Sequence, residues 1–64
     1  MTSVTMADLG DGVRIRHAVW DMTGTIRIAG PVTEIRWDDT FGAFEISDEG
    51  PVWPEDVEII GEAA

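Results

Sequence analysis

The sequence of 64 residues contains no cysteine, lysine, asparagine, glutamine or tyrosine. Without cysteine, the chain can form neither a disulfide bond nor a zinc site with thiolate ligands. Its core must be thin, because a domain this small buries only about 60% of the surface that its unfolded chain exposes. We therefore expect a single domain over residues 1–64, with an ordered core over about 10–60, that is stabilised by packing and helped by self-association.

The sequence also has no apolar run that approaches the roughly 20 residues of a membrane-spanning helix. Its first residues, Met1 to Thr5, show neither the basic start nor the apolar stretch of a secretion signal. These features predict a cytoplasmic location without membrane contact. The missing residue types are typical of a GC-rich genome, which favours a bacterial or phage source.

Basic residues are scarce and are confined to the first part of the chain. Residues 1–37 hold four acids and four arginines, so their charges cancel. Residues 38–64 hold nine acids and no basic residue, and they carry the whole net charge of −9. We expect such a protein to be repelled by bare nucleic acid and by anionic membranes, and to attract basic protein partners.

Alternation of apolar and polar residues predicts five short strands, and no window shows the 3.6-residue period of a helix. The expected strands are residues 13–17, 24–28, 32–37, 43–47 and 58–60. The positions expected to face the core are Val13, Ile15, Ile26, Ile28, Ile35, Trp37, Phe44 and Ile46. Pro54 is followed by two acids, which predicts a 3-10 turn just before the last strand. Residues 1–9 are expected to form a frayed lead-in.

The order of these elements predicts an all-β fold, a small five-stranded SH3-like barrel with a 3-10 turn before the last strand. Full closure of the barrel would leave no exposed strand edge, which suits a chain this short. A five-stranded OB-type barrel is the alternative. That fold usually has a helix between its third and fourth strands, and no segment of this sequence predicts one.

Three segments carry a resemblance to known proteins: G-T-I-R-I at 24–28, E-I-R-W-D-D at 34–39 and G-P-V-W-P-E-D-V-E-I-I at 50–60. Together they resemble small SH3-like barrel proteins of actinobacteria and their phages, in which a V-x-W-D-D strand end is followed by a short strand and a P-x-D-[LV]-E close. They are also similar to a small actinobacterial domain of unknown function with a V-R-W-D-D-G core. The resemblance implies the fold and is nearly silent on function.

Patterns that indicate catalysis or metal binding are weak. His17 is the only histidine, no serine lies in a nucleophile elbow, and we expect His17 to be partly exposed at a strand end. The adjacent acid pairs lack the spacing of a calcium loop, and no phosphate-binding loop is present. The arginines fall at outward strand positions, where surface ion pairs are their expected role. We therefore expect no enzyme activity, no cofactor and no metal site.

Aromatic residues outside the strands are the stronger signal. Trp37 is expected to cap the core, whereas Trp20, Phe41 and Trp53 lie in loops or at loop edges; for Trp53, capping the barrel is an equal alternative. Exposed aromatics often anchor interfaces, and aromatic grooves flanked by acids bind Pro-rich or Arg-containing peptides. The expected partner-binding residues are Trp20, Phe41, Trp53, Asp38, Asp39, Asp48 and Glu49.

Two functions are consistent with these patterns. The first is a small non-catalytic protein-interaction module, accessory or phage-encoded, that binds a basic protein or a second copy of itself through its loop aromatics and the neighbouring acids. The alternative is an acidic nucleic-acid mimic that occupies a DNA- or RNA-binding protein. Mimicry requires acids arrayed in rows on one face of the molecule.

Overall fold

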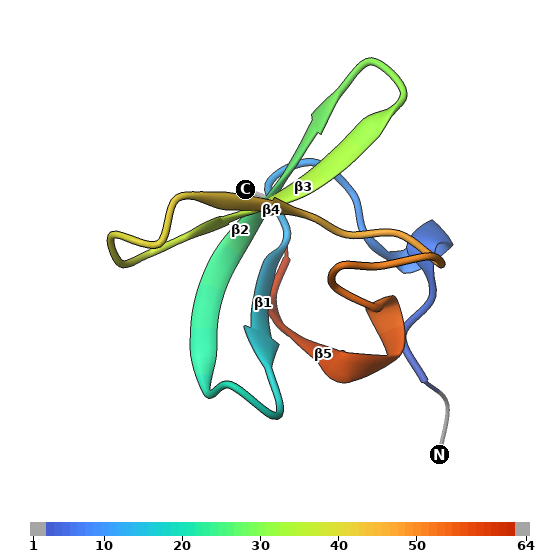
Figure 1. Cartoon of the computed structure of the whole chain (residues 1–64). Helices are drawn as coiled ribbons and strands as arrows, with labels where there is room; N and C mark the ends of the chain where they lie inside the picture. Colours follow the sequence, from blue (N-terminus) through green and yellow to red (C-terminus); the bar gives the residue numbers. More distant parts are fainter. Residues whose placement is uncertain (1–2, 63–64) are drawn as a thin grey trace.

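The computed structural model describes residues 3–62 and contains a five-stranded antiparallel sheet (Figure 1). Its strands are β1 (Arg14–His17), β2 (Met22–Ala29), β3 (Val32–Trp37), β4 (Ala43–Glu45) and β5 (Val57–Gly61). Two 3-10 turns, η1 (Met6–Asp8) and η2 (Pro54–Asp56), are the helical elements of the described residues. The predictions of an all-β fold, of five strands and of a 3-10 turn before the last strand are therefore confirmed.

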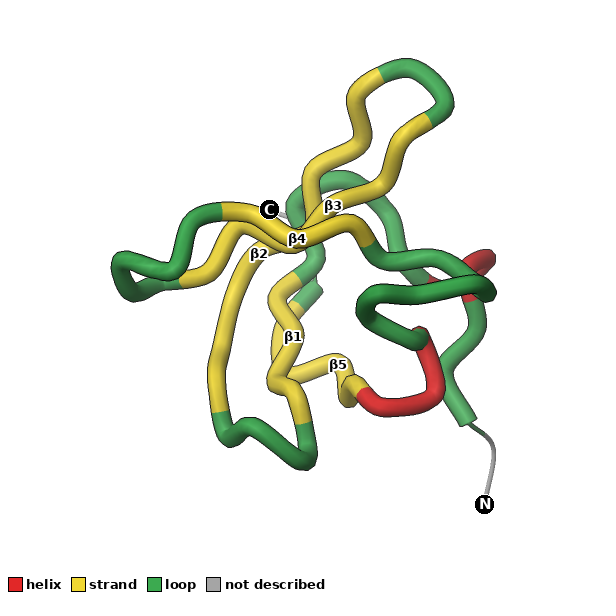
Figure 2. Tube along the Cα trace, in the orientation of Figure 1, coloured by secondary structure: helices red, strands yellow, loops and turns green. Residues whose placement is uncertain are grey.

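The strands are hydrogen-bonded in the order β4-β3-β2-β1-β5, so that β4 and β5 form the two edges of the sheet (Figure 2). Within residues 3–62 these edges do not pair with each other, and the sheet does not close into a barrel. The predicted closure is wrong because β4 ends after three residues, at Glu45. Beyond β4 the chain makes a single parallel bridge, from Ile46 to Val52, before it turns toward β5.

The longest strand, β2, pairs with two neighbours. It pairs with β1 from Met22 to Thr25 and with β3 from Gly24 to Ala29. Past Thr25 the β2–β3 hairpin extends beyond β1 and projects from the body of the molecule (Figure 1). Ile28 lies on this projecting part and is 45% exposed, so the prediction that it faces the core is wrong.

The core lies on one side of the sheet and is built from inward strand positions. Ile15, Ile26 and Ile35 are fully buried, and Ile26 lies directly opposite Ile35 in the sheet. The other buried apolar residues are Leu9, Val13, Trp37, Ile46, Val52 and Val57. Burial of one such side chain stabilises the fold by about 1.5–3 kcal/mol. Apart from Ile28, the predicted inward positions are confirmed, with Phe44 half-buried against the core.

The N-terminal segment is part of the fold, so the prediction of a frayed lead-in is wrong for residues 3–9; residues 1–2 lie outside the described part. The Asp8 carboxylate accepts the Thr5 backbone N–H at 2.9 Å and the Thr5 hydroxyl at 3.1 Å, which closes η1. Leu9 then enters the core, and Val4 and Met6 pack against it. A single leucine without a periodic pattern gave no signal for this contact.

Candidate functional site

Four aromatic side chains, which we call the aromatic cluster, pack together: His17 at the end of β1, Trp20 in the β1–β2 loop, Trp37 at the end of β3 and Phe44 in β4. The ring centroid of Trp20 lies 6.2 Å from that of Trp37 and 6.1 Å from that of Phe44. Trp37 and Phe44 meet edge to face at 5.8 Å. Such ring pairs contribute about 0.5–1.5 kcal/mol each beyond the area they bury.

The β1–β2 loop, residues 18–21, is folded around His17. The backbone N–H groups of Val19 and Trp20 donate to Nδ1 of His17 at 3.2 and 3.1 Å. The Asp21 N–H donates to the carbonyl oxygen of His17 at 2.9 Å. Asp21 has a φ of 56°, in the left-handed region that Asp tolerates better than most residues, and this closes the loop tightly. The Trp20 ring consequently lies flat on the imidazole, with 4.0 Å between centroids and 7° between planes.

His17 is buried, with only 3% of its surface exposed, so the prediction of a partly exposed histidine is wrong. Trp20 covers one face of the imidazole ring, and Val57 of β5 lies opposite His17 in the sheet. Burial lowers the pKa of His17 below its ordinary value, and the negative charge of Asp56 opposes part of this effect. Because Nδ1 accepts two N–H groups, the proton of the neutral ring is on Nε2.

Trp20 is 44% exposed, which confirms its predicted exposure, although the rest of the aromatic cluster supports it from the core side. A large rigid ring that is already held in one orientation loses little conformational entropy when a partner covers it. Tryptophan is also among the residues that most often dominate the binding energy of an interface. Among the exposed aromatics, Trp20 is therefore the one best prepared to act as an anchor.

Phe41 is exposed as predicted, at 59% of its surface. Trp53, for which exposure and capping of the barrel are equal expectations, is 41% exposed. Neither ring pairs with another aromatic among the described residues. Phe41 lies in the β3–β4 loop, which is joined to the start of β2 where the Asp38 N–H donates to the Thr23 carbonyl at 3.0 Å. Trp53 lies against Gly50, where an added Cβ would be 3.3 Å from the indole Nε1. The structure thus places Phe41 in the β3–β4 loop and Trp53 at a separate turn.

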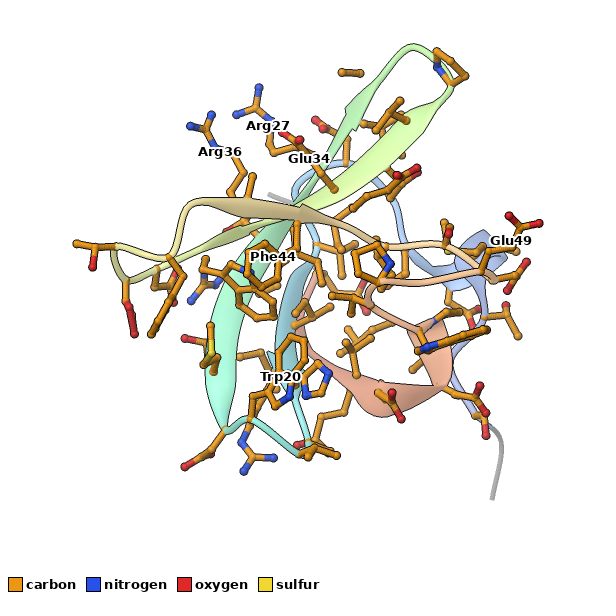
Figure 3. All side chains as sticks on the ribbon, viewed as in Figure 1. Trp20, Arg27, Glu34, Arg36, Phe44 and Glu49 are labelled. Carbon is orange, nitrogen blue, oxygen red and sulfur yellow. The ribbon has the colours of Figure 1, made fainter. Side chains whose placement is uncertain are left out.

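Asp38, one of the predicted partner-binding acids, is engaged within the fold. Its carboxylate accepts two hydrogen bonds from the Arg14 guanidinium, at 2.7 and 2.6 Å, and one from the Thr23 hydroxyl. These bonds lower the pKa of Asp38 to about 2. The acids without an ion pair among the described residues include Asp39, Asp48 and Glu49. Figure 3 shows that Glu49 lies on a different side of the molecule from Trp20.

The four arginines occupy the outward positions of β1, β2 and β3, opposite the core. Figure 3 shows Arg27 and Arg36 projecting from this outer face together with Glu34. Arg14, Arg16 and Arg27 make ion pairs, which confirms the expected role for these three, whereas Arg36 makes none among the described residues. These pairs are Arg14–Asp38, Arg16–Asp21, Arg16–Glu58 and Arg27–Asp11. Exposed pairs of this kind contribute little to stability because water screens them, and they leave the excess negative charge on the later half of the chain.

Within residues 3–62, no three His, Asp or Glu side chains gather closely enough to hold a metal ion. The same part of the chain contains no helix with the length and apolar character needed to cross a bilayer. The chain matches no protein-family model, no curated protein and no solved structure. The case for a function therefore depends on the aromatic cluster, the exposed loop aromatics and the distribution of charge.

Proposed function

We propose that the protein is a small non-catalytic interaction module of SH3-like architecture that binds a basic protein partner through Trp20. The strand order β4-β3-β2-β1-β5 and the 3-10 turn between β4 and β5 support the SH3-like assignment, with the two edges of the sheet left unpaired. The assignment concerns the fold alone, because folds of this kind serve many functions.

The observation that carries the proposal is the position of Trp20. Its ring is stacked on a buried imidazole and supported by Trp37 and Phe44, yet nearly half of its surface is open. Val19, the neighbouring loop residue, is also exposed, and Phe41 is a second exposed aromatic in the β3–β4 loop. A fixed aromatic ring that is partly exposed has the form of a binding hot spot.

The negative charge of the protein favours a basic partner. The formal net charge is −9, and the later half holds seven acids that make no ion pair among the described residues. These are Asp39, Glu45, Asp48, Glu49, Glu55, Asp56 and Glu62. A basic surface would be attracted over a distance and would associate faster at low salt. We therefore assign the apolar contact to Trp20 and the long-range attraction to the acids.

Replacing Trp20 by alanine is expected to weaken partner binding by about 2 kcal/mol or more, roughly 30-fold in Kd, because the anchor ring is lost. The test captures partners from a bacterial lysate on the wild-type protein and then measures Kd with the purified partner. Trp53→Ala, the same substitution at a separate turn, is the matched control and should change Kd by less than about fivefold. The Kd of Phe41→Ala tests whether the partner also contacts the β3–β4 loop. Equal Kd values for the wild type and Trp20→Ala would exclude the proposed site.

The nucleic-acid mimic is the second candidate, and the seven unpaired acids are the observation in its favour. A mimic would bind mainly by charge, so its affinity would fall steeply as salt rises and would scarcely change in Trp20→Ala. Neutralising Asp48 and Glu49 to Asn and Gln would weaken a mimic severalfold. The same two substitutions should affect a Trp20-anchored complex mainly through the association rate.

A further inference from the structure

We propose that His17 is a pH-sensitive latch: its neutral imidazole holds the loop that carries Trp20 against the sheet, and protonation of Nδ1 releases that loop. The inference goes beyond the proposed function and does not depend on it, because the latch is a property of the isolated protein. It rests on the two backbone N–H groups that share one imidazole nitrogen.

The chemistry of the latch is a change of one nitrogen from acceptor to donor. In the neutral ring, the Nδ1 lone pair accepts the N–H groups of Val19 and Trp20. A proton taken from solvent occupies that lone pair, and three N–H groups then point at one another. Both hydrogen bonds are lost, and the stack between the Trp20 ring and the imidazole loses the backbone support that positions it. Val19 and Trp20 are exposed, so water can accept the freed N–H groups.

The charged groups around His17 do not prevent this change. Asp56 of η2 is the acid whose charge favours the protonated ring. Arg16 of β1 is occupied by Asp21 of the loop and by Glu58 of β5. The residues paired with His17 in the sheet, Met22 of β2 and Val57 of β5, are uncharged. Its aromatic neighbours Trp20 and Trp37 are uncharged too, as is Phe44 of β4, which packs on Trp20.

The release is local because the body of the fold is held by other bonds. The backbone pairing of β1 with β2 and with β5 does not use the imidazole. The Ala18 N–H donates to the Asp56 carbonyl at 2.9 Å, which fixes the start of the loop independently of His17. The Arg14–Asp38 ion pair also survives mild acid, since the pKa of Asp38 is about 2.

The direction of the pH effect follows from the burial of His17. Burial lowers its pKa in the folded protein below the ordinary value of 6.5. The neutral, latched form is therefore complete above about pH 6.5, and it is lost as pH falls through the lower folded pKa. The latch should be closed at neutral pH and open in mild acid.

The test is a pH titration of the wild-type protein by NMR from pH 7.5 to 4.5. The His17 ring-proton shift reports protonation, and amide hydrogen exchange of Val19 and Trp20 reports release. One pH unit below the His17 midpoint, these two amides should lose protection by about tenfold, after correction for the intrinsic pH dependence of exchange. The amides of Ile26 and Ile46, which bond within the body of the fold, should keep theirs.

Two substitutions separate the latch from a general loss of stability. In His17→Asn, the amide oxygen replaces Nδ1 as an acceptor that does not titrate, so the loop should stay protected throughout the pH range. In His17→Phe the stack is retained without an acceptor, and the loop should be open at every pH. Asp56→Asn should move the wild-type midpoint to lower pH, because the charge that favours protonation is removed.

Three results would overturn the proposal. The first is unchanged protection of Val19 and Trp20 when the His17 shift shows full protonation. The second is the same loss of protection, at the same pH, in His17→Asn. The third is simultaneous loss of protection at Ile26 and Ile46, which would show global unfolding in place of a latch. None of these measurements requires a partner, so they can fail or succeed independently of the binding experiment with Trp20→Ala.

Discussion

Replacing Trp37 by alanine is expected to unfold a large fraction of the protein at room temperature. Trp37 is buried and touches both Trp20 and Phe44, so the substitution removes the centre of the aromatic cluster. Truncation of a buried tryptophan to alanine costs about 3–5 kcal/mol. At about 0.05–0.15 kcal/mol per residue, a chain of 64 residues has a total stability of only about 3–10 kcal/mol. One substitution thus removes a large part of it.

Urea denaturation followed by circular dichroism measures this loss, and two substitutions serve as controls. Trp53→Ala makes the same chemical change at an exposed turn and should cost about 1 kcal/mol or less. Trp37→Phe should be milder than Trp37→Ala, because phenylalanine keeps an aromatic ring in the core. It also loses no hydrogen bond, since the indole Nε1 is buried without a partner among the described residues. A wild-type denaturation midpoint in Trp37→Ala would contradict the packing described above.

Gly24→Ala is expected to destabilise the protein by about 1–3 kcal/mol or more, which is the cost of overpacking a tight site. Gly24 lies opposite Trp37, where β2 passes close to β3. A Cβ at this position would be 2.7 Å from the Arg36 carbonyl oxygen and 2.7 Å from the Ile35 side chain. The carbonyl belongs to the β3 backbone and cannot move without disturbing the pairing that aligns the aromatic cluster.

Gly10→Ala is the matched control, since a Cβ there would meet only a Val13 methyl group at an ordinary 3.9 Å. At such a position, alanine reduces the freedom of the unfolded chain and stabilises by about 0.4–1 kcal/mol. The two glycine substitutions should therefore change the free energy of unfolding in opposite directions, as measured by urea denaturation. Stabilisation by Gly24→Ala would show that β2 and β3 are not as close as described.

The parts of the fold that could be predicted are those where alternation is strict and turn residues bound the segment. β3 runs from Val32 to Trp37, as predicted, because Pro31 precedes it and two aspartates follow. Leu9 was missed because a residue that enters the core from an irregular segment leaves no periodic pattern. The exposure of Ile28 was missed because alternation identifies a face of a strand but not the length over which a neighbour covers it.

The sequence predicted the candidate site only in part. The exposure of Trp20 followed from its place in a loop, but the rings that support it come from three different strands, and sequence alone does not bring them together. His17 did carry a usable signal, because it follows Val13 and Ile15 at the inward spacing of β1. Its hydrogen bonds to the loop belong to a tight turn that ends in the left-handed residue Asp21, and no sequence pattern indicates that turn.

The central claim is that Trp20 is held open to solvent by a packed aromatic cluster, and NMR at neutral pH tests it most directly. Nuclear Overhauser cross-peaks should connect the Trp20 ring protons with those of His17 and Phe44, at ring separations of 4.0 and 6.1 Å between centroids. A soluble paramagnetic agent should broaden the Trp20 ring signals more than those of Trp37. Absence of these cross-peaks, or equal broadening of the two tryptophans, would contradict the account.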